Sequence, residues 1–397
     1  MRIAIVGVNQ GVIGGAETYL TWLFGALLGA GHQLAFAYEI PSVDPARAVD
    51  RGIEPLVRWD LQTLSRPAFL AELTAFEPDV VFLQGSRDEA LDLELARGFR
   101  AALFAHAFYA TCATGWRVHQ IPQREVCSRR FGPACLPVNY FRGCGARNPV
   151  ALLKLYSRQR GRSDVLQALA GTLVASEYMR DVYVQHGVPE RNLRVIPYPA
   201  ERAPDPVPPA PSSSPSRVLF LGRLTSGKGA ARAIQVVARC QRKLGRPLHL
   251  TIAGTGPELE RCKRFASKLK IETEFTGWVG QDRRLELLRA ADVLIVPSMW
   301  PEPFGIVGIE AASVGLPAVA YSVGGIVDWL RPGISGELAD GPDFAPAPLV
   351  EALARAFASP EHHRSLQLGA WRMAHEFSAE RHLSRLVAWF EELATQK

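Results

Sequence analysis

Short apolar segments rich in β-branched residues alternate with helical segments along nearly the whole chain, and the alternation occurs in two series. The first series begins at RIAIVGV, residues 2–8, and ends at TLVAS, residues 172–176. The second begins at RVLFLGR, residues 217–223, and includes DVLIVPS, residues 292–298. Strands that are buried on both faces and separated by helices have this pattern. The sequence therefore predicts an α/β protein with two doubly wound, Rossmann-like domains.

A Pro/Ser-rich stretch, residues 199–216, separates the two series and is predicted to be a linker, because it suits neither a helix nor a strand ladder. The predicted domains are residues 1–198 and 217–370. Residues 371–397 are predicted to form one long amphipathic helix. A chain of 397 residues agrees with two cores rather than one. Two such domains are expected to enclose a central cleft between the carboxyl-terminal edges of their sheets.

The composition is globular, with 48% hydrophobic and 21% charged residues, and it excludes disordered, collagen-like and coiled-coil chains. The formal net charge is +6, and residues 117–162 contain ten Lys or Arg residues against one acidic residue, Glu125. Such a segment favours an acidic, lipid-linked or saccharide acceptor, or a phospholipid surface. A solvated basic surface is the alternative. No nucleic-acid-reading motif accompanies the charge, so nucleic acid is not an expected partner.

The first nine residues, MRIAIVGVN, are interpreted as a strand rather than a secretory signal, because a long apolar region and a cleavage site are missing. The longest apolar helical stretch, residues 19–30, is shorter than the ~20 residues of a membrane-spanning helix. Six cysteines are too few for a disulfide scaffold. We therefore expect a cytoplasmic protein, and peripheral attachment to the inner membrane face is compatible with its basic segment.

The segment PEPFGIVGIE, residues 301–310, follows a predicted strand and contains two glutamates eight positions apart, Glu302 and Glu310. If a helix begins within FGIVG, the backbone amides of residues 304–307 form an anion-binding helix end. The Glu310 carboxylate then lies one or two turns further on, where it can accept hydrogen bonds from paired ribose hydroxyls, while Glu302 faces another part of the ligand. A capping glutamate and a surface glutamate are the alternative.

The segment GRLTSGKG, residues 222–229, nearly matches a phosphate-binding Walker A loop, but Gly229 stands where Ser or Thr would bind Mg²⁺. A complete Walker loop is therefore not expected. Arg223 and Lys228 are two cations on a strand-to-helix turn, and each can neutralise a phosphate. A surface loop with solvated charges is the alternative.

Two features of the first domain are further candidates. Gly14 and Gly15 end a glycine-rich turn whose spacing does not fit a nicotinamide fingerprint, so the turn is interpreted as a flexible loop that approaches a phosphate or a sugar. His106 follows the strand AALFA, at the strand edge where open α/β sheets bind ligands, and is expected to hydrogen-bond a sugar hydroxyl. A histidine with a purely structural role is the alternative.

Four of the six cysteines, at positions 112–144, form a candidate site for structural zinc. No C-x₂₋₄-C pair is present, so free thiols or labile disulfides remain open beside a metal. The four residues are Cys112, Cys127, Cys135 and Cys144.

Seven short motifs, in this order and spacing along almost the whole chain, resemble those of glycosyltransferase family 4. They are Gly14-Gly15-Ala16-Glu17, Ser176 in ASEYMRD, Gly222-Arg223-Leu224 with Lys228-Gly229, Ala253-Gly254-Thr255-Gly256-Pro257, Thr276-Gly277-Trp278-Val279, Glu302-Pro303-Phe304-Gly305 with Glu310, and Ser322-Val323-Gly324-Gly325. The resemblance implies the GT-B fold, two Rossmann-like domains with the donor held mainly by the second and a carboxyl-terminal helix that crosses back to the first. It departs from many relatives at Asp328, where they have Glu.

By this resemblance Arg223 and Lys228 hold the donor diphosphate, Glu310 binds the ribose, and Glu302 contacts the transferred sugar. Residues near Trp278 and Val279 flank the base, and His106 lies near the sugar. The catalytic residues implied are Glu302, His106, Arg223 and Lys228. The donor-binding residues implied are Gly14, Gly15, Arg223, Lys228, Gly254, Trp278, Val279, Glu302, Phe304, Gly305, Ile306, Val307 and Glu310.

The resemblance implies a retaining enzyme that moves a sugar from a nucleotide sugar, with a UDP-sugar as the expected donor, to a polysaccharide, glycolipid or metabolite acceptor. Fixed cations and helix-end amides would stabilise the departing diphosphate, so no catalytic metal is expected. Asp92-Leu93-Glu94 is interpreted as the surface of a helix rather than as a metal motif. The alternatives are a nucleotide-sugar epimerase of the same fold, a nucleotide-sugar-binding protein without turnover, and a P-loop kinase, which Gly229 disfavours.

Overall fold

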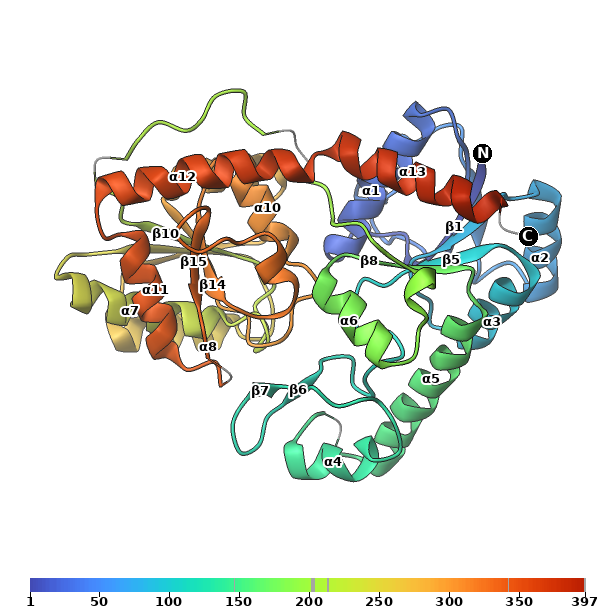
Figure 1. Cartoon of the computed structure of the whole chain (residues 1–397), viewed down its shortest axis with the longest axis horizontal. Coiled ribbons are helices and arrows are strands. Elements are labelled where there is room, and N and C mark those ends of the chain that lie inside the picture. Colours follow the sequence, from blue (N-terminus) through green and yellow to red (C-terminus); the bar gives the residue numbers. More distant parts are fainter. Residues whose placement is uncertain (146, 201–203, 213, 342, 396–397) are drawn as a thin grey trace. The chain divides into compact units, whose positions relative to one another are not determined.

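The computed structural model describes residues 1–145, 147–200, 204–212, 214–341 and 343–395, and its contacts divide the chain into two compact units. Unit 1 comprises Met1–Trp116, Ser128–Glu201 and Glu380–Lys397, and unit 2 comprises Arg117–Cys127 and Arg202–Ala379. Each unit is built around one parallel β-sheet (Figure 1). The chain is thus an α/β protein with two doubly wound, Rossmann-like domains, as the alternation of strands and helices predicts.

The sheet of unit 1 has the strand order β3-β2-β1-β4-β5-β8-β9, and all the strand pairs in it are parallel. Central strands such as β4 are buried along their whole length, because helices cover both faces. The strands are β1 (Arg2–Asn9), β2 (Gln33–Ile40), β3 (Val57–Asp60), β4 (Val80–Leu83), β5 (Ala101–Phe104), β8 (Gly171–Val174) and β9 (Leu193–Val195). The helices are α1 (Gly15–Gly29), α2 (Arg66–Phe76), α3 (Glu89–Gly98), α4 (Cys135–Arg142), α5 (Pro149–Ala168) and α6 (Glu177–Gln185).

The sheet of unit 2 has the order β12-β11-β10-β13-β14-β15, so its first and fourth strands lie side by side, as in the Rossmann arrangement. The loops that follow β10 and β13 therefore emerge together at one edge, which is where such sheets bind ligands. The strands are β10 (Arg217–Leu221), β11 (His249–Ala253), β12 (Thr273–Gly277), β13 (Val293–Val296), β14 (Ala318–Tyr321) and β15 (Gly336–Ala339). The helices are α7 (Ala230–Leu244), α8 (Leu259–Leu269), α9 (Gln281–Ala290), α10 (Ile306–Ser313), α11 (Pro346–Ala356) and α12 (Pro360–Ala374).

The basic segment 117–162 contributes to both units. Its first part forms a small antiparallel hairpin of β6 (Val118–His119) and β7 (Glu125–Val126), which groups with unit 2 although it interrupts the sequence of unit 1. Its later part forms α4 and the 20-residue helix α5 of unit 1 (Figure 1). The predicted boundary at residues 199–216 therefore differs from the division into two units, because residues 117–127 belong to unit 2.

The carboxyl-terminal stretch is not one continuous helix. α12 ends at Ala374, a 3₁₀ turn covers His375–Phe377, and α13 (Ala379–Thr395) begins after the extended residue Ser378. Phe377 packs against Phe304 in unit 2, with ring centroids 5.7 Å apart. This contact fixes the turn at the end of α12.

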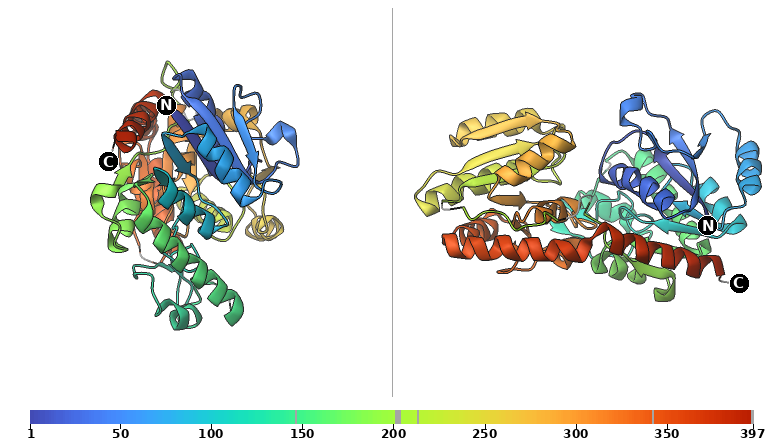
Figure 2. Two further views of the ribbon diagram at one scale, coloured as in Figure 1. Left: turned by 90° about the vertical axis from the view of Figure 1, so that its right-hand side faces the viewer. Right: turned by 90° about the horizontal axis from the view of Figure 1, so that it is seen from above.

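The helix α13 packs on unit 1 (Figure 2). Trp389 and Phe390 contact Phe82 of β4, with ring centroids 6.4 and 4.9 Å away. His382 joins two elements of the same unit, since its Nδ1 donates to the carbonyl of Pro197 at 2.7 Å and its Nε2 accepts from the Tyr19 hydroxyl at 2.9 Å. Within the described ranges, no helix has both the length and the apolar character needed to cross a membrane.

Candidate functional site

The loop after β10, residues 222–229, is tied to the loop after β11. The Gly222 amide donates to the Ala253 carbonyl at 3.0 Å, and the Leu224 amide donates to the Thr255 carbonyl at 2.9 Å. Gly254 has a φ of +141°, and a Cβ there would lie 2.0 Å from the Gly222 carbonyl oxygen. Close backbone packing therefore requires a glycine at position 254, whatever contact it makes with a donor.

The same loop is held against the segment after β13. The Met299 amide donates to the Gly227 carbonyl at 2.7 Å. Gly229 is the left-handed N-cap of α7, with a φ of +78°, and a Cβ there would lie 2.2 Å from the Pro297 carbonyl oxygen. The residue that makes the Walker pattern incomplete is thus required by the packing of two loops at the sheet edge.

Lys228 and Glu302 meet where these two loops join. The Lys228 ammonium donates to both carboxylate oxygens of Glu302, at 2.8 and 2.9 Å. Glu302 is 3% exposed, whereas the Lys228 side chain is 37% exposed. The buried carboxylate is therefore neutralised by a cation that still reaches solvent.

Two further donors hold the Glu302 carboxylate. The Ser298 hydroxyl donates to Oε1 at 2.6 Å, and the Trp300 indole nitrogen donates to the same oxygen at 2.8 Å. The Glu302 carbonyl accepts from the Gly325 amide at 2.8 Å, which holds the backbone as well. Sequence reasoning did not assign Ser298 or Trp300, although both precede Glu302 in the same loop. This set of donors fixes the orientation of the carboxylate before any ligand binds.

The helix α10 begins at Ile306, after Gly305 in the left-handed conformation with a φ of +90°. The amides of Ile306 and Val307 thus belong to the first helical turn, whose amides have no acceptor within the helix itself. Phe304 has another role, because its side chain is 1% exposed and its carbonyl accepts from the Trp329 indole nitrogen at 2.7 Å. The helix start is therefore anchored from behind by the core of unit 2.

Glu310 lies one turn into α10, and its side chain is 12% exposed. Arg284 Nη1 of α9 lies 3.4 Å from Glu310 Oε1. This role of Arg284 is not predictable from the sequence, because Arg284 is one of several charged residues in a helix with the pattern of a surface helix. The carboxylate that was assigned to a ribose is thus held in place by a neighbouring cation.

The remaining predicted residues of unit 2 lie at the same sheet edge. Arg223 is exposed and follows β10 directly. Trp278 is 62% exposed, and with Val279 it follows β12, the outermost strand on that side. The predicted diphosphate, ribose and base residues of unit 2 thus all come after strands of one parallel sheet, namely β10, β12 and β13.

In unit 1 the glycine-rich turn precedes α1. Gly15 is the first residue of that helix, and the Gly14 amide donates to Glu17 Oε2 at 2.9 Å. The Asn9 side chain donates to the other Glu17 oxygen at 3.0 Å. Glu17 therefore closes the turn between β1 and α1, and sequence reasoning used Glu17 only as part of a motif.

His106 lies after β5, and protein groups hold both of its ring nitrogens. Nδ1 pairs with the Tyr198 hydroxyl, and Nε2 lies 2.7 Å from Gln84 Oε1. Burial lowers the pKa of His106 to about 3, so the ring is neutral at physiological pH. A sugar hydroxyl can therefore hydrogen-bond to His106 only if it displaces Tyr198 or Gln84. The sequence gives no indication of these two partners.

A pocket of about 190 Å³ opens beside His106 in unit 1. Gln84 and His106 follow β4 and β5, so they line it from the carboxyl edge of the sheet, and Gln159 and Arg162 line it from α5. Gln84 Nε2 is a buried nitrogen without a hydrogen-bond partner among the described residues. The side chain of Gln84 thus lines the pocket and holds a buried nitrogen whose hydrogen-bonding capacity is unused.

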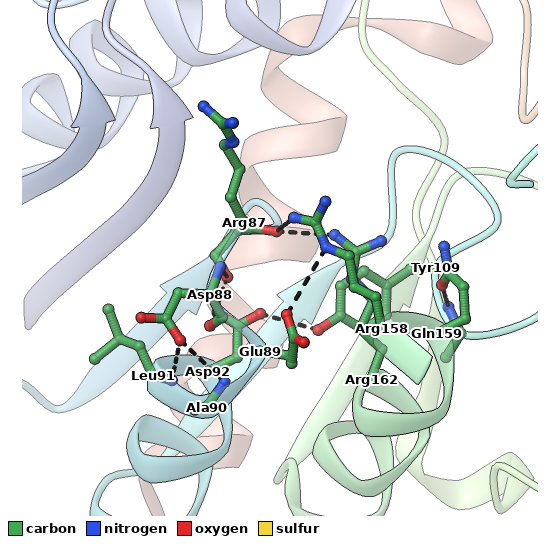
Figure 3. A network of polar contacts seen from close by, with 12 residues as sticks. Arg87, Asp88, Glu89, Ala90, Leu91, Asp92, Tyr109, Arg158, Gln159 and Arg162 are labelled. Atoms are coloured by element: carbon green, nitrogen blue, oxygen red, sulfur yellow. Dashed lines mark hydrogen bonds and ion pairs between the residues drawn. The ribbon is translucent and has the colours of Figure 1, made fainter. Parts of the chain in front are cut away.

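Figure 3 shows how the arginines of α5 lie beside α3. Arg158 and Arg162 both donate to the Ser86 carbonyl, at 3.3 and 2.8 Å. The Arg162 guanidinium stacks over Tyr109, 4.5 Å from the ring centroid, and the Tyr109 hydroxyl donates to Asp92 at 2.9 Å. Burial lowers the pKa of Arg162. Part of the basic segment is thus built into the protein rather than fully solvated.

The interpretation of Asp92-Leu93-Glu94 as a surface face is wrong for Asp92. This residue is 1% exposed, and burial is the first reason that its pKa is raised. Its place in α3 turns the carboxylate toward Tyr109 of the neighbouring loop, so the charge pattern of the helix alone was misleading.

The four cysteines that are candidate zinc ligands lie in the loops around β6 and β7, at the start of α4 and just after α4. In the part of the chain that the structure describes, no three His, Cys, Asp or Glu side chains converge as metal ligands do. Cys112 Sγ lies 3.5 Å from the Thr114 hydroxyl, and Cys144 Sγ lies 4.0 Å from the Val138 carbonyl, so local groups of the loop and of α4 surround these thiols. Structural zinc at these cysteines therefore stays a prediction.

Comparison with known proteins gives these observations a family context. Residues 205–370 match the family of glycosyl transferases group 1. The D-inositol 3-phosphate glycosyltransferase of Geodermatophilus obscurus is 35% identical over 189 residues, which cover 45% of this chain and 41% of that protein. The chain spans between 29% and 41% of the length of the curated relatives it matches.

Solved structures match over the full length. Sucrose-phosphate synthase from Thermosynechococcus elongatus has a TM-score of 0.72 at 19% identity, covering 99% of this chain and 98% of that chain. Anabaena HepE in complex with UDP and glucose has a TM-score of 0.70 at 16% identity, covering 99% and 100%. The fold is therefore GT-B, with two Rossmann-like domains. Within it, residues 205–370 are the part that matches the glycosyl transferases group 1 family.

Proposed function

We propose that this protein is a retaining glycosyltransferase of family 4 that transfers a sugar from a nucleotide sugar, with a UDP-sugar as donor. The observation that carries the proposal is the ion pair of Lys228 with Glu302 beside the first turn of α10, with Glu310 one turn further on. A cation, free helix-end amides and a carboxylate in this order match a diphosphate followed by a ribose. The group 1 domain supports this function, and the similar fold of HepE, which was solved with UDP, supports the choice of nucleotide.

In the proposed reaction the bond between the sugar C1 and the diphosphate oxygen breaks, and the electron pair stays on the diphosphate. The hydroxyl oxygen of the acceptor forms the new bond to C1 on the same face and passes its proton to the departing diphosphate oxygen. Arg223, Lys228 and the amides of Ile306 and Val307 stabilise the charge that grows on the leaving group.

Lys228 has to serve two anions in this account. In the structure it neutralises Glu302, and a bound diphosphate would share its ammonium, which has three donor hydrogens. Ser298 and Trp300 continue to donate hydrogen bonds to the Glu302 carboxylate while Lys228 also binds the diphosphate. Glu302 then contacts the transferred sugar with an orientation that those donors fix.

The acceptor is proposed to bind the pocket of unit 1 beside His106. Gln84 lines this pocket with its polar side chain, and Arg162 supplies a positive charge from α5. A polysaccharide, a glycolipid or a phosphorylated metabolite fits this chemistry. A cytoplasmic location, with the basic segment 117–162 near the inner membrane face, belongs to the same proposal.

The proposal is tested by incubating the protein with UDP-glucose, UDP-galactose and UDP-N-acetylglucosamine and measuring UDP release. Slow transfer to water should occur with one of them, and proton NMR should show the α-anomer of the sugar first if an α-linked donor reacts with retention. Arg223→Ala should reduce release at least tenfold, whereas Arg239→Ala, an exposed position on α7, should leave it unchanged. Equal rates for both variants would contradict the assignment of the donor site.

A further inference from the structure

Another pocket, of about 210 Å³, lies in unit 2 between α7, α8 and the hairpin of residues 117–127. We name it the α7 pocket. The predicted diphosphate residues Arg223 and Lys228 are not among its lining residues. Six residues that define it are Arg124, Ser226, Gly229, Arg232, Glu258 and Arg261.

Two arginines face this pocket without an acidic partner among the described residues. Arg124 donates to the Ser226 carbonyl at 3.1 Å, and its Nε is buried with no partner. Among the described residues, the hydrogen-bond partners of Arg232 are neutral: the Gln235 amide oxygen at 3.3 Å and the Met299 sulfur at 3.7 Å. Two guanidinium groups near each other without a counterion are unfavourable, because like charges repel and burial removes water.

The electrostatic consequence is visible on Arg124. Burial lowers the pKa of this arginine, and the nearby positive charge of Arg232 lowers it further. The third arginine, Arg261, pairs with Glu258 at 2.6 Å, so the one carboxylate that lines the pocket is already neutralised. The pocket therefore has a positive surplus that an anion would balance.

The backbone adds to this surplus. The 15-residue helix α7 begins at Ala230, and Ala230, Ala231 and Arg232 of its first turn line the pocket. Its N-cap, Gly229, provides no side chain to bond the amides of that turn. The positive end of the helix dipole thus points to the same place as the two arginines.

We propose that the α7 pocket binds a phosphate monoester, at a site separate from the nucleotide donor site. Arg124 and Arg232 hold the phosphate oxygens with charge-assisted hydrogen bonds, and the first-turn amides of α7 complete the site. Phe265 and Met299 form an apolar part of the lining that suits the carbon skeleton of the ligand. The bound dianion removes the repulsion between the arginines and so fixes the hairpin to unit 2.

The test is a calorimetric titration of the full chain with inorganic phosphate and with glucose 6-phosphate, each in the absence and presence of excess UDP. Both probes should bind whether or not UDP is present. Arg124→Gln and Arg232→Gln should each weaken this binding about tenfold or more, because each removes a charge-assisted contact. Arg239→Gln, on the exposed side of α7, is the matched control and should bind like the wild type.

Lys228→Ala separates this site from the donor site, since it should weaken UDP binding by a much larger factor than glucose 6-phosphate binding. If wild-type protein does not bind UDP, the proposed function fails while the phosphate titration is still interpretable. Thermal unfolding of each variant checks that it is folded. Because Arg124 and Arg232 lie in different elements, weaker phosphate binding in one folded variant is a valid test even if the other variant does not fold.

Two results would overturn the inference. One is phosphate binding that neither arginine variant alters, and the other is displacement of both probes by UDP, which would assign them to the donor site. Vesicles with and without phosphatidic acid distinguish the source of the phosphate. Sedimentation with the phosphatidic acid vesicles that Arg124→Gln abolishes, together with no binding of glucose 6-phosphate, would support a lipid headgroup as the ligand.

Discussion

Lys228 donates to both carboxylate oxygens of Glu302, at 2.8 and 2.9 Å, although 74 positions separate the two residues. This pair connects the loop after β10 to the loop after β13, at the point where the strand order of unit 2 reverses. The buried glutamate and the half-exposed lysine thus hold the two loops in one arrangement. A donor that binds there meets a formed site.

The first prediction concerns the strength of this pair. In a double-mutant cycle of Lys228→Ala and Glu302→Gln, we expect a coupling of about 1–3 kcal/mol in the free energy of unfolding, because a buried carboxylate loses its counterion. Urea denaturation measures it. The exposed pair Lys243–Glu351, with side chains 47% and 55% exposed, is the control and should couple by less than about 1 kcal/mol. Equal coupling for the two pairs would refute this account.

The second prediction concerns Glu310 and the ribose. Wild-type protein should bind UDP about tenfold more tightly than 2′-deoxy-UDP, because the carboxylate accepts a hydrogen bond from the missing hydroxyl. Glu310→Gln should reduce this discrimination. Calorimetric titration of the two nucleotides into both proteins measures the ratio. A wild-type protein that binds both nucleotides equally would remove Glu310 from the ribose site.

The third prediction concerns the packing behind the start of α10. A Cβ on Gly308 would lie 2.0 Å from the ring of Trp329, which is fully buried. Gly308→Ala should therefore lower the free energy of unfolding by about 1–3 kcal/mol or more, measured in urea. Gly280→Ala is the matched control in the same unit, because a Cβ there meets nothing within 4 Å and the φ of −73° suits alanine. A stable Gly308→Ala variant would mean that Trp329 is free to move.

The fourth prediction concerns acid stability and His382. Burial lowers the pKa of this residue to about 4 in the folded protein, whereas an unfolded histidine titrates near 6.5. The unfolded chain binds the proton more tightly than the folded protein. The contribution of neutral His382 to the free energy of unfolding is therefore complete above pH 6.5 and is lost as the pH falls toward 4. The loss amounts to about 3 kcal/mol for a shift of this size.

The measurement is urea denaturation of the wild type and of His382→Gln at several pH values. Glutamine does not titrate, so the free energy of unfolding of the variant should fall less between pH 6.5 and 4. The difference between the two proteins isolates His382 from His106, which burial also keeps neutral. Parallel pH profiles would mean that His382 carries a proton in the folded state.

The sequence predicted the parts of the fold that depend on local pattern. Buried parallel strands separated by helices are visible as repeated apolar segments, so two doubly wound sheets followed from the sequence. The break at residues 375–377 did not, because it depends on the contact of Phe377 with Phe304, about 70 positions earlier in the chain. The grouping of residues 117–127 with unit 2 also depends on distant contacts, such as that of Arg124 with Ser226.

The candidate site shows the same limit. Motifs predict Lys228 and Glu302, which lie in loops that follow strands, and Glu310, which lies one turn into α10. Their partners were not predictable from spacing, since the ion pair of Glu310 with Arg284 arises only when α9 and α10 meet.

The measurement that tests the central claim most directly is a calorimetric titration of UDP, GDP and ADP into the wild-type protein and into Lys228→Ala. We predict saturable binding of UDP at one site per chain, weakened at least tenfold in Lys228→Ala, while thermal unfolding shows that the variant is folded. Unchanged UDP affinity in the folded variant would contradict the assignment of Lys228. Failure of all three nucleotides to bind the wild type would contradict a nucleotide donor site in unit 2.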